Sequence, residues 1–302
     1  MNALTDQITA RMQADGVNQA RLSKETGVHE SIVSPWLKGK YTGDVKKVDA
    51  TMQAWLDGRL RKQALIEVPD YQPTFTAGQI QTELAFAQGD ASLCMIYGDY
   101  GVGKSTACRH YAAGNNNVWL VTLKPSQKST GRMIQAIAYA TGMKSKSPTT
   151  DEVIERLADT GGLLIFDNAQ HLSAQALDEL SVIHDEAGIG IALVGNEYSY
   201  ANLAGNQRTN NYAQLYSRLG TRYHIDEAKS KDIVVLLDAW AAKYPEMNTA
   251  KIRKRLTGIA SQSGSLRLMT KTLKMALMLA AGDDKPFDDS HITDAWNKLG
   301  GD

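Results

Sequence analysis

The chain has 302 residues, of which 43% are hydrophobic and 22% are charged. These proportions are ordinary for a soluble globular protein, and the length suits two or three domains. The formal net charge is +0, which excludes a general attraction to polyanions and requires any nucleic-acid surface to be a local patch. Two cysteines are too few for a disulfide framework, and no apolar run approaches a membrane span. We therefore expect a soluble, cytoplasmic protein with no membrane partner.

Residues 1–60 have the pattern of short helices separated by glycines. Residues 18–25 and 29–38 are predicted to form a helix-turn-helix, with Gly27 in its turn. The second helix of this motif commonly enters the major groove of DNA, but here it contains Pro35 and lacks the Arg or Gln side chains that read bases. Use of the motif for protein contact is the alternative. The lysines that could touch phosphates are Lys38, Lys40, Lys46 and Lys47.

The rest of the chain changes from a mixed pattern to a helical one. Residues 61–76 hold two prolines and lack periodicity, so we interpret them as a linker. Between residues 77 and 225, apolar runs alternate with helical patterns, which indicates a parallel sheet covered by helices. The predicted strands are residues 93–97, 118–122, 163–166 and 189–194. From residue 226 to the end, helices are expected at 230–243, 249–262, 266–281 and 290–299.

The first apolar run leads into G-D-Y-G-V-G-K-S, which fits the G-x-x-x-x-G-K-[ST] pattern at every fixed position. Glycines let the backbone turn tightly, so that its N–H groups and the next helix N-terminus face phosphate. Lys104 is expected to reach the β- and γ-phosphates of ATP, and Ser105 to bind Mg²⁺. A chance glycine-rich turn is the alternative. The predicted nucleotide-binding residues are Gly98, Asp99, Tyr100, Gly101, Val102, Gly103, Lys104, Ser105 and Thr106.

The third predicted strand is followed by Asp167, the position of the Mg²⁺ carboxylate in phosphate-loop proteins. An aspartate that caps the following helix is the alternative. The next residue, Asn168, cannot accept a proton from the attacking water. Because losing a general base typically costs ~10²–10⁴-fold in rate, we expect slow ATP hydrolysis unless a nearby carboxylate substitutes. ATP binding should survive, since it depends on the loop and the metal.

Further polar residues are candidates for contacting the γ-phosphate. Asn196 follows the fourth predicted strand and is the candidate first sensor, with a turn asparagine as the alternative. Arg218 and Arg222 stand four apart in what we expect to be a short helical segment, so they would share one face. One of them would act as an arginine finger on the ATP of a neighbouring subunit. Arg267, after Gly-Ser-Leu, is the candidate second sensor. Solvated surface arginines are the alternative.

The region from residue 248 to residue 282 contains no carboxylate, although the whole chain is neutral. Lysine and arginine contacts to phosphate give sequence-independent affinity for nucleic acid, which falls steeply with salt. A solvated helix face is the alternative. The candidate DNA-binding residues here are Arg253, Lys254, Arg255, Lys271 and Lys274. Further candidates, expected from the family resemblance described below, are the basic residues after the second predicted strand, namely Lys124, Lys128 and Arg132.

The order of phosphate loop, strand-ending Asp, sensor Asn, Ser-Arg pair and Gly-Ser-Leu-Arg is that of AAA+ ATPases. The chain also resembles the family of the phage Mu transposition protein B, in stretches at residues 40–44, 115–119, 167–172, 206–209 and 215–218. The resemblance implies an α/β AAA+ P-loop NTPase, with a parallel sheet and a helical lid, preceded by a small all-α helix-turn-helix domain. The expected domains are residues 1–60, the linker 61–76, the ATPase core 77–225 and the lid and C-terminal DNA-binding domain 226–302.

The resemblance also implies a function. It implies an ATP-dependent protein that binds double-stranded DNA without sequence preference, polymerises on it as a helical filament, and captures target DNA for a transposase that it stimulates. The place of action would be the host cell cytoplasm if the chain is phage-encoded. The main departure from the family's pattern is Asn168, at a position where AAA+ proteins usually carry Glu. Two other interpretations stay open: a helicase loader or DNA remodeller with rapid ATP turnover, and an ATP-gated, sequence-specific repressor.

Overall fold

The computed structural model describes residues 3–63, 66–197, 218–283 and 286–301, without the side chains of residues 60–63 and 283. The chain divides into two compact units, Met1–Glu67 and Val68–Asp302. Among the described residues, no helix combines the length and the apolar character that crossing a membrane requires.

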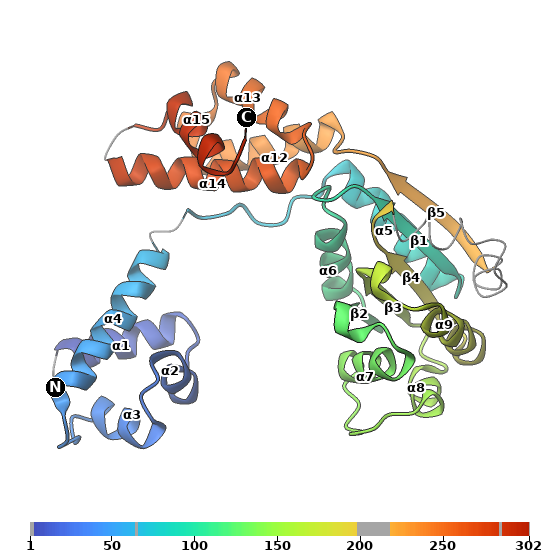
Figure 1. Ribbon diagram of the computed structural model, residues 1–302, viewed down its shortest axis with the longest axis horizontal. Coiled ribbons are helices and arrows are strands. Elements are labelled where there is room, and N and C mark those ends of the chain that lie inside the picture. The colour runs from blue at the N-terminus through green and yellow to red at the C-terminus, as the bar shows by residue number, and fades with distance from the viewer. Residues whose placement is uncertain (1–2, 64–65, 198–217, 284–285, 302) are drawn as a thin grey trace. The chain divides into compact units, whose positions relative to one another are not determined.

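The first unit is built from helices α1 (Ala3–Ala14), α2 (Gln19–Thr26), α3 (Glu30–Leu37) and α4 (Val45–Gln63), drawn in blue in Figure 1. The predicted pair of helices corresponds to α2 and α3. The Asn18 side chain caps α2 by accepting a backbone N–H bond, and Gly27 ends it with φ of 72°, a conformation that glycine adopts readily. The helices close around a shared apolar core, which includes Ile8, Leu22, Val33, Trp36, Met52 and Leu56.

The second unit contains a five-stranded sheet in the order β2-β3-β4-β1-β5. Every neighbouring pair of strands is parallel, so the carboxyl ends of the strands meet at one edge. The strands are β1 (Leu93–Gly98), β2 (Val118–Thr122), β3 (Leu163–Asp167), β4 (Gly190–Val194) and β5 (Leu219–Ile225). The first four lie where strands were predicted.

The fifth strand corrects the helical segment expected around Arg218 and Arg222. Arg222 lies within β5, and Arg218 directly precedes it. Along β5 the buried and exposed positions alternate, with Arg222 and His224 exposed. This alternation is typical of an edge strand with one covered face, and it lacks the continuous apolar run that marks the other strands. The prediction of a helix here was therefore wrong.

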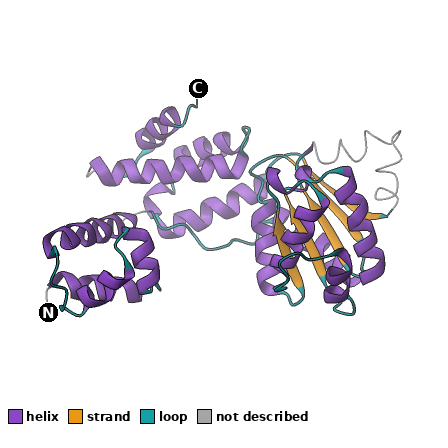
Figure 2. Ribbon diagram, turned by 60° about the horizontal axis from the view of Figure 1, so that its bottom comes forward, coloured by secondary structure: helices purple, strands orange, loops and turns teal. Residues whose placement is uncertain are grey.

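Helices cover both faces of the sheet, because alternate residues of each strand point to opposite sides. On one face, Cys94, Ile96 and Ile165 share a core with α5 (Phe75–Gly89) and α6 (Lys104–Gly114). On the other face, Met95 and Phe166 share a core with α7 (Thr130–Ala140), α8 (Thr150–Leu157) and α9 (Ala174–Ala187). Figure 2 shows the orange strands between these two layers of helices.

After β5 the chain forms the helical lid that the sequence predicts. Its helices are α12 (Ser230–Lys243), α13 (Ala250–Ala260), α14 (Ser265–Asp283) and α15 (Asp289–Lys298). They pack around buried side chains that include Trp240, Leu256, Met269, Leu273 and Ile292. A parallel α/β sheet, a helical lid and a preceding all-helical unit together make up the expected fold class.

Buried hydrogen bonds join the lid to the start of α5. Asp232, in α12, is 0% exposed, and its carboxylate accepts bonds from the backbone N–H and the hydroxyl of Thr76. A buried carboxylate is tolerated only where such donors replace water. Next to this joint, Nζ of Lys231 lies 5.2 Å from the ring centroid of Phe75. The first turn of α12 is thereby fixed to the first turn of α5.

We expect Asp232→Ala to lower the free energy of unfolding by about 1–3 kcal/mol, because it leaves two buried donors of Thr76 without an acceptor. Asp238→Ala is the matched control on the same helix. The side chain of Asp238 is 61% exposed, so its loss should cost less than ~1 kcal/mol. Urea unfolding followed by circular dichroism measures both effects, and equal losses would contradict a stabilising joint.

Candidate functional site

The phosphate loop links the carboxyl end of β1 to the N-terminus of α6. Gly98, Gly101 and Gly103 have φ of 133°, 83° and 101°, in the region that favours glycine. A Cβ at Gly98 would collide with the carbonyl oxygen of Ile225, and one at Gly101 with the carbonyl oxygen of Gly264. The loop is thus held between the end of β5 and the start of α14, with backbone against backbone.

Lys104 opens α6, and its ammonium group is turned back onto the loop. Nζ donates hydrogen bonds to the carbonyl oxygens of Gly98 at 2.8 Å and Asp99 at 2.6 Å. Burial is the main reason why the pKa of Lys104 is lowered to about 8. The positive charge of Arg267 also lowers this pKa, whereas the carboxylates of Asp99 and Asp167 raise it. A phosphate group in the loop would favour the charged ammonium, since opposite charges attract strongly where water is excluded.

Ser105 and Asp167 lie side by side, as the sequence predicts for a pair that shares a metal ion. The Ser105 hydroxyl donates to Oδ1 of Asp167 at 3.0 Å, and Asp167 is only 4% exposed. Asn168 follows in the left-handed region with φ of 63°, and its backbone N–H donates to the same carboxylate oxygen at 3.1 Å. Asparagine tolerates this conformation better than most residues. The carboxylate of Asp167 is therefore oriented by the hydroxyl of Ser105 and by the backbone N–H of Asn168.

Asn196 lies at the carboxyl end of β4, next to the phosphate loop. Its Nδ2 donates a hydrogen bond to the phenol oxygen of Tyr100, a loop residue that is 56% exposed. The register pairs Val194 of β4 with Asp167 of β3, which brings the candidate sensor and the candidate metal ligand to the same edge of the sheet.

A cluster around His224 was not predicted. Nε2 of His224 contacts Oε1 of Glu197, and Nδ1 lies 2.9 Å from Oδ1 of Asp226. The imidazole ring also stacks on Tyr97 of β1, with the ring centroids 4.6 Å apart. His224 belongs to the strand that the sequence pattern missed, so its neighbours on β1 and β4 could not be foreseen. The cluster places a further carboxylate, Glu197, directly after the candidate sensor.

The two candidate finger arginines differ in their surroundings. Arg218 donates through Nη2 and Nε to the Asp185 carboxylate of α9, at 2.9 Å and 3.1 Å. Arg222 is an exposed residue of β5. Both arginines therefore lie at the β5 edge of the sheet. The family-like stretches at residues 206–209 and 215–217 lie outside the described residues.

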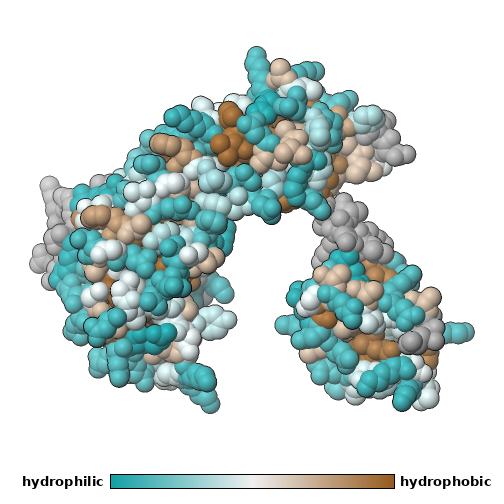
Figure 3. Space-filling model, turned by 180° about the vertical axis from the view of Figure 1, so that it is seen from behind, coloured by the Kyte–Doolittle hydropathy of each residue, from teal (hydrophilic) through white to brown (hydrophobic). Residues whose placement is uncertain are grey.

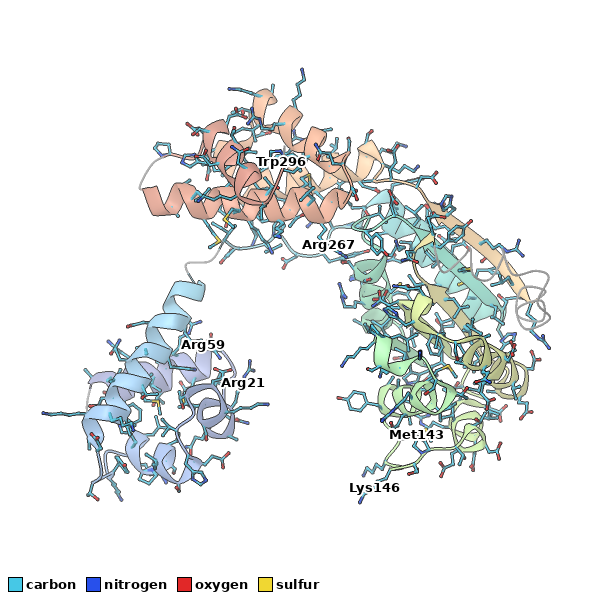
Figure 4. All side chains as sticks on the ribbon, viewed as in Figure 1. Arg21, Arg59, Met143, Lys146, Arg267 and Trp296 are labelled. Carbon is cyan, nitrogen blue, oxygen red and sulfur yellow. The ribbon has the colours of Figure 1, made fainter. Side chains whose placement is uncertain are left out.

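Arg267 lies where the lid meets the phosphate loop, as Figure 4 shows. It is in the first turn of α14, it is exposed, and its own Cβ would lie 3.3 Å from a Cβ built on Gly101. The side chain of Arg267 therefore starts close to the loop, and its role as a second sensor stays a prediction.

The candidate DNA-binding residues after β2 lie close together in the chain and are all exposed. Lys124 and Lys128 flank the short helix η1 (Pro125–Gln127), and Arg132 is in the first turn of α7. Because β2 is an edge strand of the sheet, these side chains border the sheet on the side opposite to β5.

In the lid, acidic residues of α12 and α15 form ion pairs with two arginines of α13. Arg253 pairs with Asp238 at 2.6 Å, and Arg255 pairs with Asp289 at 3.1 Å. Lys254 and Lys271 are exposed, and Lys274 is half-buried. The surface of the lid seen in Figure 3 is mostly hydrophilic, with small apolar patches between polar residues. The ion pairs of Arg253 and Arg255 thus offset part of the positive charge that the sequence of this region carries.

In the first unit, Arg11, Arg21 and Arg59 are bound to carboxylates, and the lysines around the end of α3 are exposed. Arg59 donates to Asp15 at 2.7 Å and also contacts Glu25. Hydrogen bonds from Trp55 and then from Arg59 lower the pKa of Glu25 to about 2. The exposed lysines at the end of α3 and the start of α4 are Lys38, Lys40, Lys46 and Lys47.

Two family models match successive parts of the chain. The AAA domain model matches residues 87–203, which include the phosphate loop and Asp167. The model of the Mu B transposition protein, C terminal, matches residues 217–299, which include β5 and the lid.

Solved structures agree on the fold of the second unit. The ORC2 protein of Aeropyrum pernix, in its ADPNP-ADP complexes, has a TM-score of 0.57 and 17% identity, covering 77% of this chain and 69% of that chain. Domain III of the replication initiation protein DnaA of Thermotoga maritima has a TM-score of 0.52 and 14% identity, covering 77% of this chain and 94% of that chain. At these identities the likeness concerns the fold alone, which is that of an AAA+ P-loop NTPase.

Relatives of higher identity extend along nearly the whole chain. The ATP-dependent target DNA activator B of Escherichia phage Mu is 33% identical over 283 residues, which cover 92% of this chain and 89% of the relative. The Mu-like prophage FluMu DNA transposition protein B of Haemophilus influenzae is 32% identical over 275 residues, which cover 89% of this chain and 94% of the relative. Together with the phosphate loop, the adjoining lid and the matched models, these relatives show that the chain belongs to the Mu B transposition protein family of AAA+ ATPases.

Proposed function

We propose that the chain is an ATP-dependent activator of target DNA in transposition. It binds duplex DNA without reading its sequence, assembles with itself into a helical filament, delivers the DNA to a transposase and stimulates that enzyme. The observation that carries the proposal is the complete phosphate loop in contact with the lid, in a relative of an ATP-dependent target DNA activator. As a phage-type protein it would act in the host cell cytoplasm.

The residues at the loop fit ATP together with Mg²⁺. The hydroxyl of Ser105 and the carboxylate of Asp167 are hard oxygen donors at neighbouring positions, the kind of ligand that Mg²⁺ prefers. When bound, the ion neutralises negative charge on the β- and γ-phosphates. Lys104 exchanges its bonds to loop carbonyls for bonds to phosphate oxygens. Arg267 approaches the same phosphates from the lid, and Arg218 or Arg222 approaches the ATP of a neighbouring subunit.

The DNA-binding surface that we propose runs along α14. Arg267, Lys271 and Lys274 are spaced at i, i+4 and i+7, so they share one helix face. The first of them lies at the phosphate loop, and the others continue away from it along the same helix. A change at the nucleotide would therefore move the DNA-contacting lysines as part of one rigid element. Lys124, Lys128 and Arg132 would contact DNA from the core.

ATP hydrolysis is slow in this proposal, because Asn168 stands where a proton acceptor is expected. We predict that Asn168→Glu raises the steady-state turnover of ATP by ~10²-fold and leaves ATP affinity unchanged, since it supplies a general base. Asn168→Gln is the matched control, because it has the size of Glu and cannot take a proton. Phosphate release with and without duplex DNA measures turnover. If Glu and Gln variants turned over equally slowly, Asn168 would not occupy the water-activating position.

The dependence of DNA binding on ATP is the central test of the proposal. We expect the wild-type chain to bind random duplex at least ~10-fold more tightly with ATP than with ADP, and Lys104→Ala to bind weakly with both, since it loses the phosphate contact. Lys298→Ala, an exposed lysine of α15, is the control. Electron microscopy of protein with duplex and ATP should reveal filaments. Monomers at saturating ATP, or equally tight binding without nucleotide, would contradict the proposal.

The proposed DNA-binding surface of α14 can be tested through the salt dependence of DNA affinity. Each lost phosphate contact reduces the slope of log affinity against log salt by about 0.9, so Lys271→Ala with Lys274→Ala should reduce it by about 2. The loss should be the same on duplexes of unrelated sequence. Lys251→Ala is the control, because this lysine pairs with Asp289 at 3.1 Å. An unchanged slope in the double variant would place the DNA elsewhere.

A further inference from the structure

The stretch of chain from Tyr100 to Thr150 contains no aspartate or glutamate, although the chain as a whole is neutral. Its basic residues include five that follow β2 and are all exposed, namely Lys124, Lys128, Arg132, Lys144 and Lys146. Within the part of the chain that the structure describes, none of these five forms an ion pair. Their positive charge is therefore not offset by carboxylates at contact distance there.

The basic residues of the lid have different surroundings. Lys251 and Arg255 of α13 pair with Asp289, and Arg253 pairs with Asp238. A phosphate group that bound these residues would have to compete with a carboxylate that is already in place. The basic residues around α7 present no such competition, so they suit a polyanion better.

Helix α7 has one face in the core and the other in solvent. Met133 and Ile137 are buried, whereas Arg132 and Tyr139, seven positions apart, share the exposed face. Tyr139 is 89% exposed. The helix has 11 residues and is therefore about 16 Å long, the length of about five base pairs of duplex. The exposed face can thus follow a DNA backbone over several phosphates.

The loop after α7 is fixed at both of its ends. Met143 is partly buried and packs against the core below the sheet helices. At the other end, the Thr149 hydroxyl accepts the backbone N–H of Glu152, whose carboxylate accepts the backbone N–H of Thr149. Lys144 and Lys146 lie between these anchors, and Figure 4 shows Lys146 pointing away from the sheet. A loop anchored in this way loses little conformational entropy when its lysines bind a partner.

We propose that the exposed face of α7 and the loop after it form a second DNA-binding surface, in addition to the one along α14. Lys144 and Lys146 bind phosphates of the duplex backbone, and the hydroxyl of Tyr139 donates a hydrogen bond to a phosphate oxygen. Contacts of this kind fix the position of a duplex without reading its bases. This inference rests on the proposed function, in which duplex DNA is the partner. It continues the candidate residues Lys124, Lys128 and Arg132 past the end of α7.

The test measures binding of the full chain with ATP to a random duplex, by fluorescence anisotropy at several salt concentrations. Lys144→Ala with Lys146→Ala should reduce the slope of log affinity against log salt by about 2, since each lost phosphate contact removes about 0.9. Lys144→Arg with Lys146→Arg keeps both charges and should keep the wild-type slope. Lys229→Ala with Lys298→Ala removes two exposed lysines elsewhere and should also keep it.

Tyr139→Phe gives a different result, because a neutral hydroxyl releases no counterion. It should weaken duplex binding about fivefold at every salt concentration, the effect of one hydrogen bond, and leave the salt slope unchanged. Unchanged affinity of this variant would overturn the role of Tyr139.

An unchanged slope in the Lys144→Ala and Lys146→Ala double variant would overturn the second surface. An equal reduction in the Lys229→Ala and Lys298→Ala control would also overturn it, since the loss would then follow net charge alone. Normal DNA binding with reduced stimulation of the transposase would assign the surface to protein contact instead. Circular dichroism and ATP affinity should match the wild type in every variant, because the exchanged side chains are exposed. A wild-type chain that failed to bind duplex with ATP would contradict the proposed function itself.

Discussion

At two glycines of the phosphate loop, the space that a side chain would fill is occupied by backbone from distant parts of the chain. The carbonyl group of Ile225, at the end of β5, lies against Gly98, and the carbonyl group of Gly264, before α14, lies against Gly101. Sheet edge, phosphate loop and lid therefore meet through their main chains. Because close-packed backbone transmits displacement with little slack, occupancy of the loop is coupled to the start of α14. The positions of Arg267 and of the lysines further along α14, relative to the phosphate loop, depend on this contact.

Two features of the chain bear on the proposed slow hydrolysis of ATP and on the proposed contact between subunits. Asp167 is buried and oriented by Ser105, whereas the side chain of Asn168 offers no proton acceptor, which is why the proposed function includes slow ATP hydrolysis. Arg218 is bonded to Asp185 of its own chain. A subunit contact that used Arg218 would replace this carboxylate by a phosphate, which exchanges one charge-assisted pair for another.

The folded lid has a different charge distribution from the one that its sequence suggests. Asp238 of α12 and Asp289 of α15 are brought against arginines of α13, so part of the positive charge is neutralised locally. The remaining lysines on α14 form a narrow strip in a neutral protein. Such a strip favours contact with a phosphate backbone at low salt, whereas the net charge of the whole chain gives no general attraction to polyanions.

The sequence by itself determined the phosphate loop, the strand before it and the helix after it, because these features form between consecutive residues. Asn18 and Gly27 likewise mark the ends of α2 through local backbone chemistry. Asp167 could be placed because it ends a continuous apolar strand. Tertiary structure alone decided that Arg222 lies on a strand, that Arg218 meets Asp185, and that Tyr100 meets Asn196. These contacts join distant positions, and they depend on strand order and register, which local periodicity does not specify.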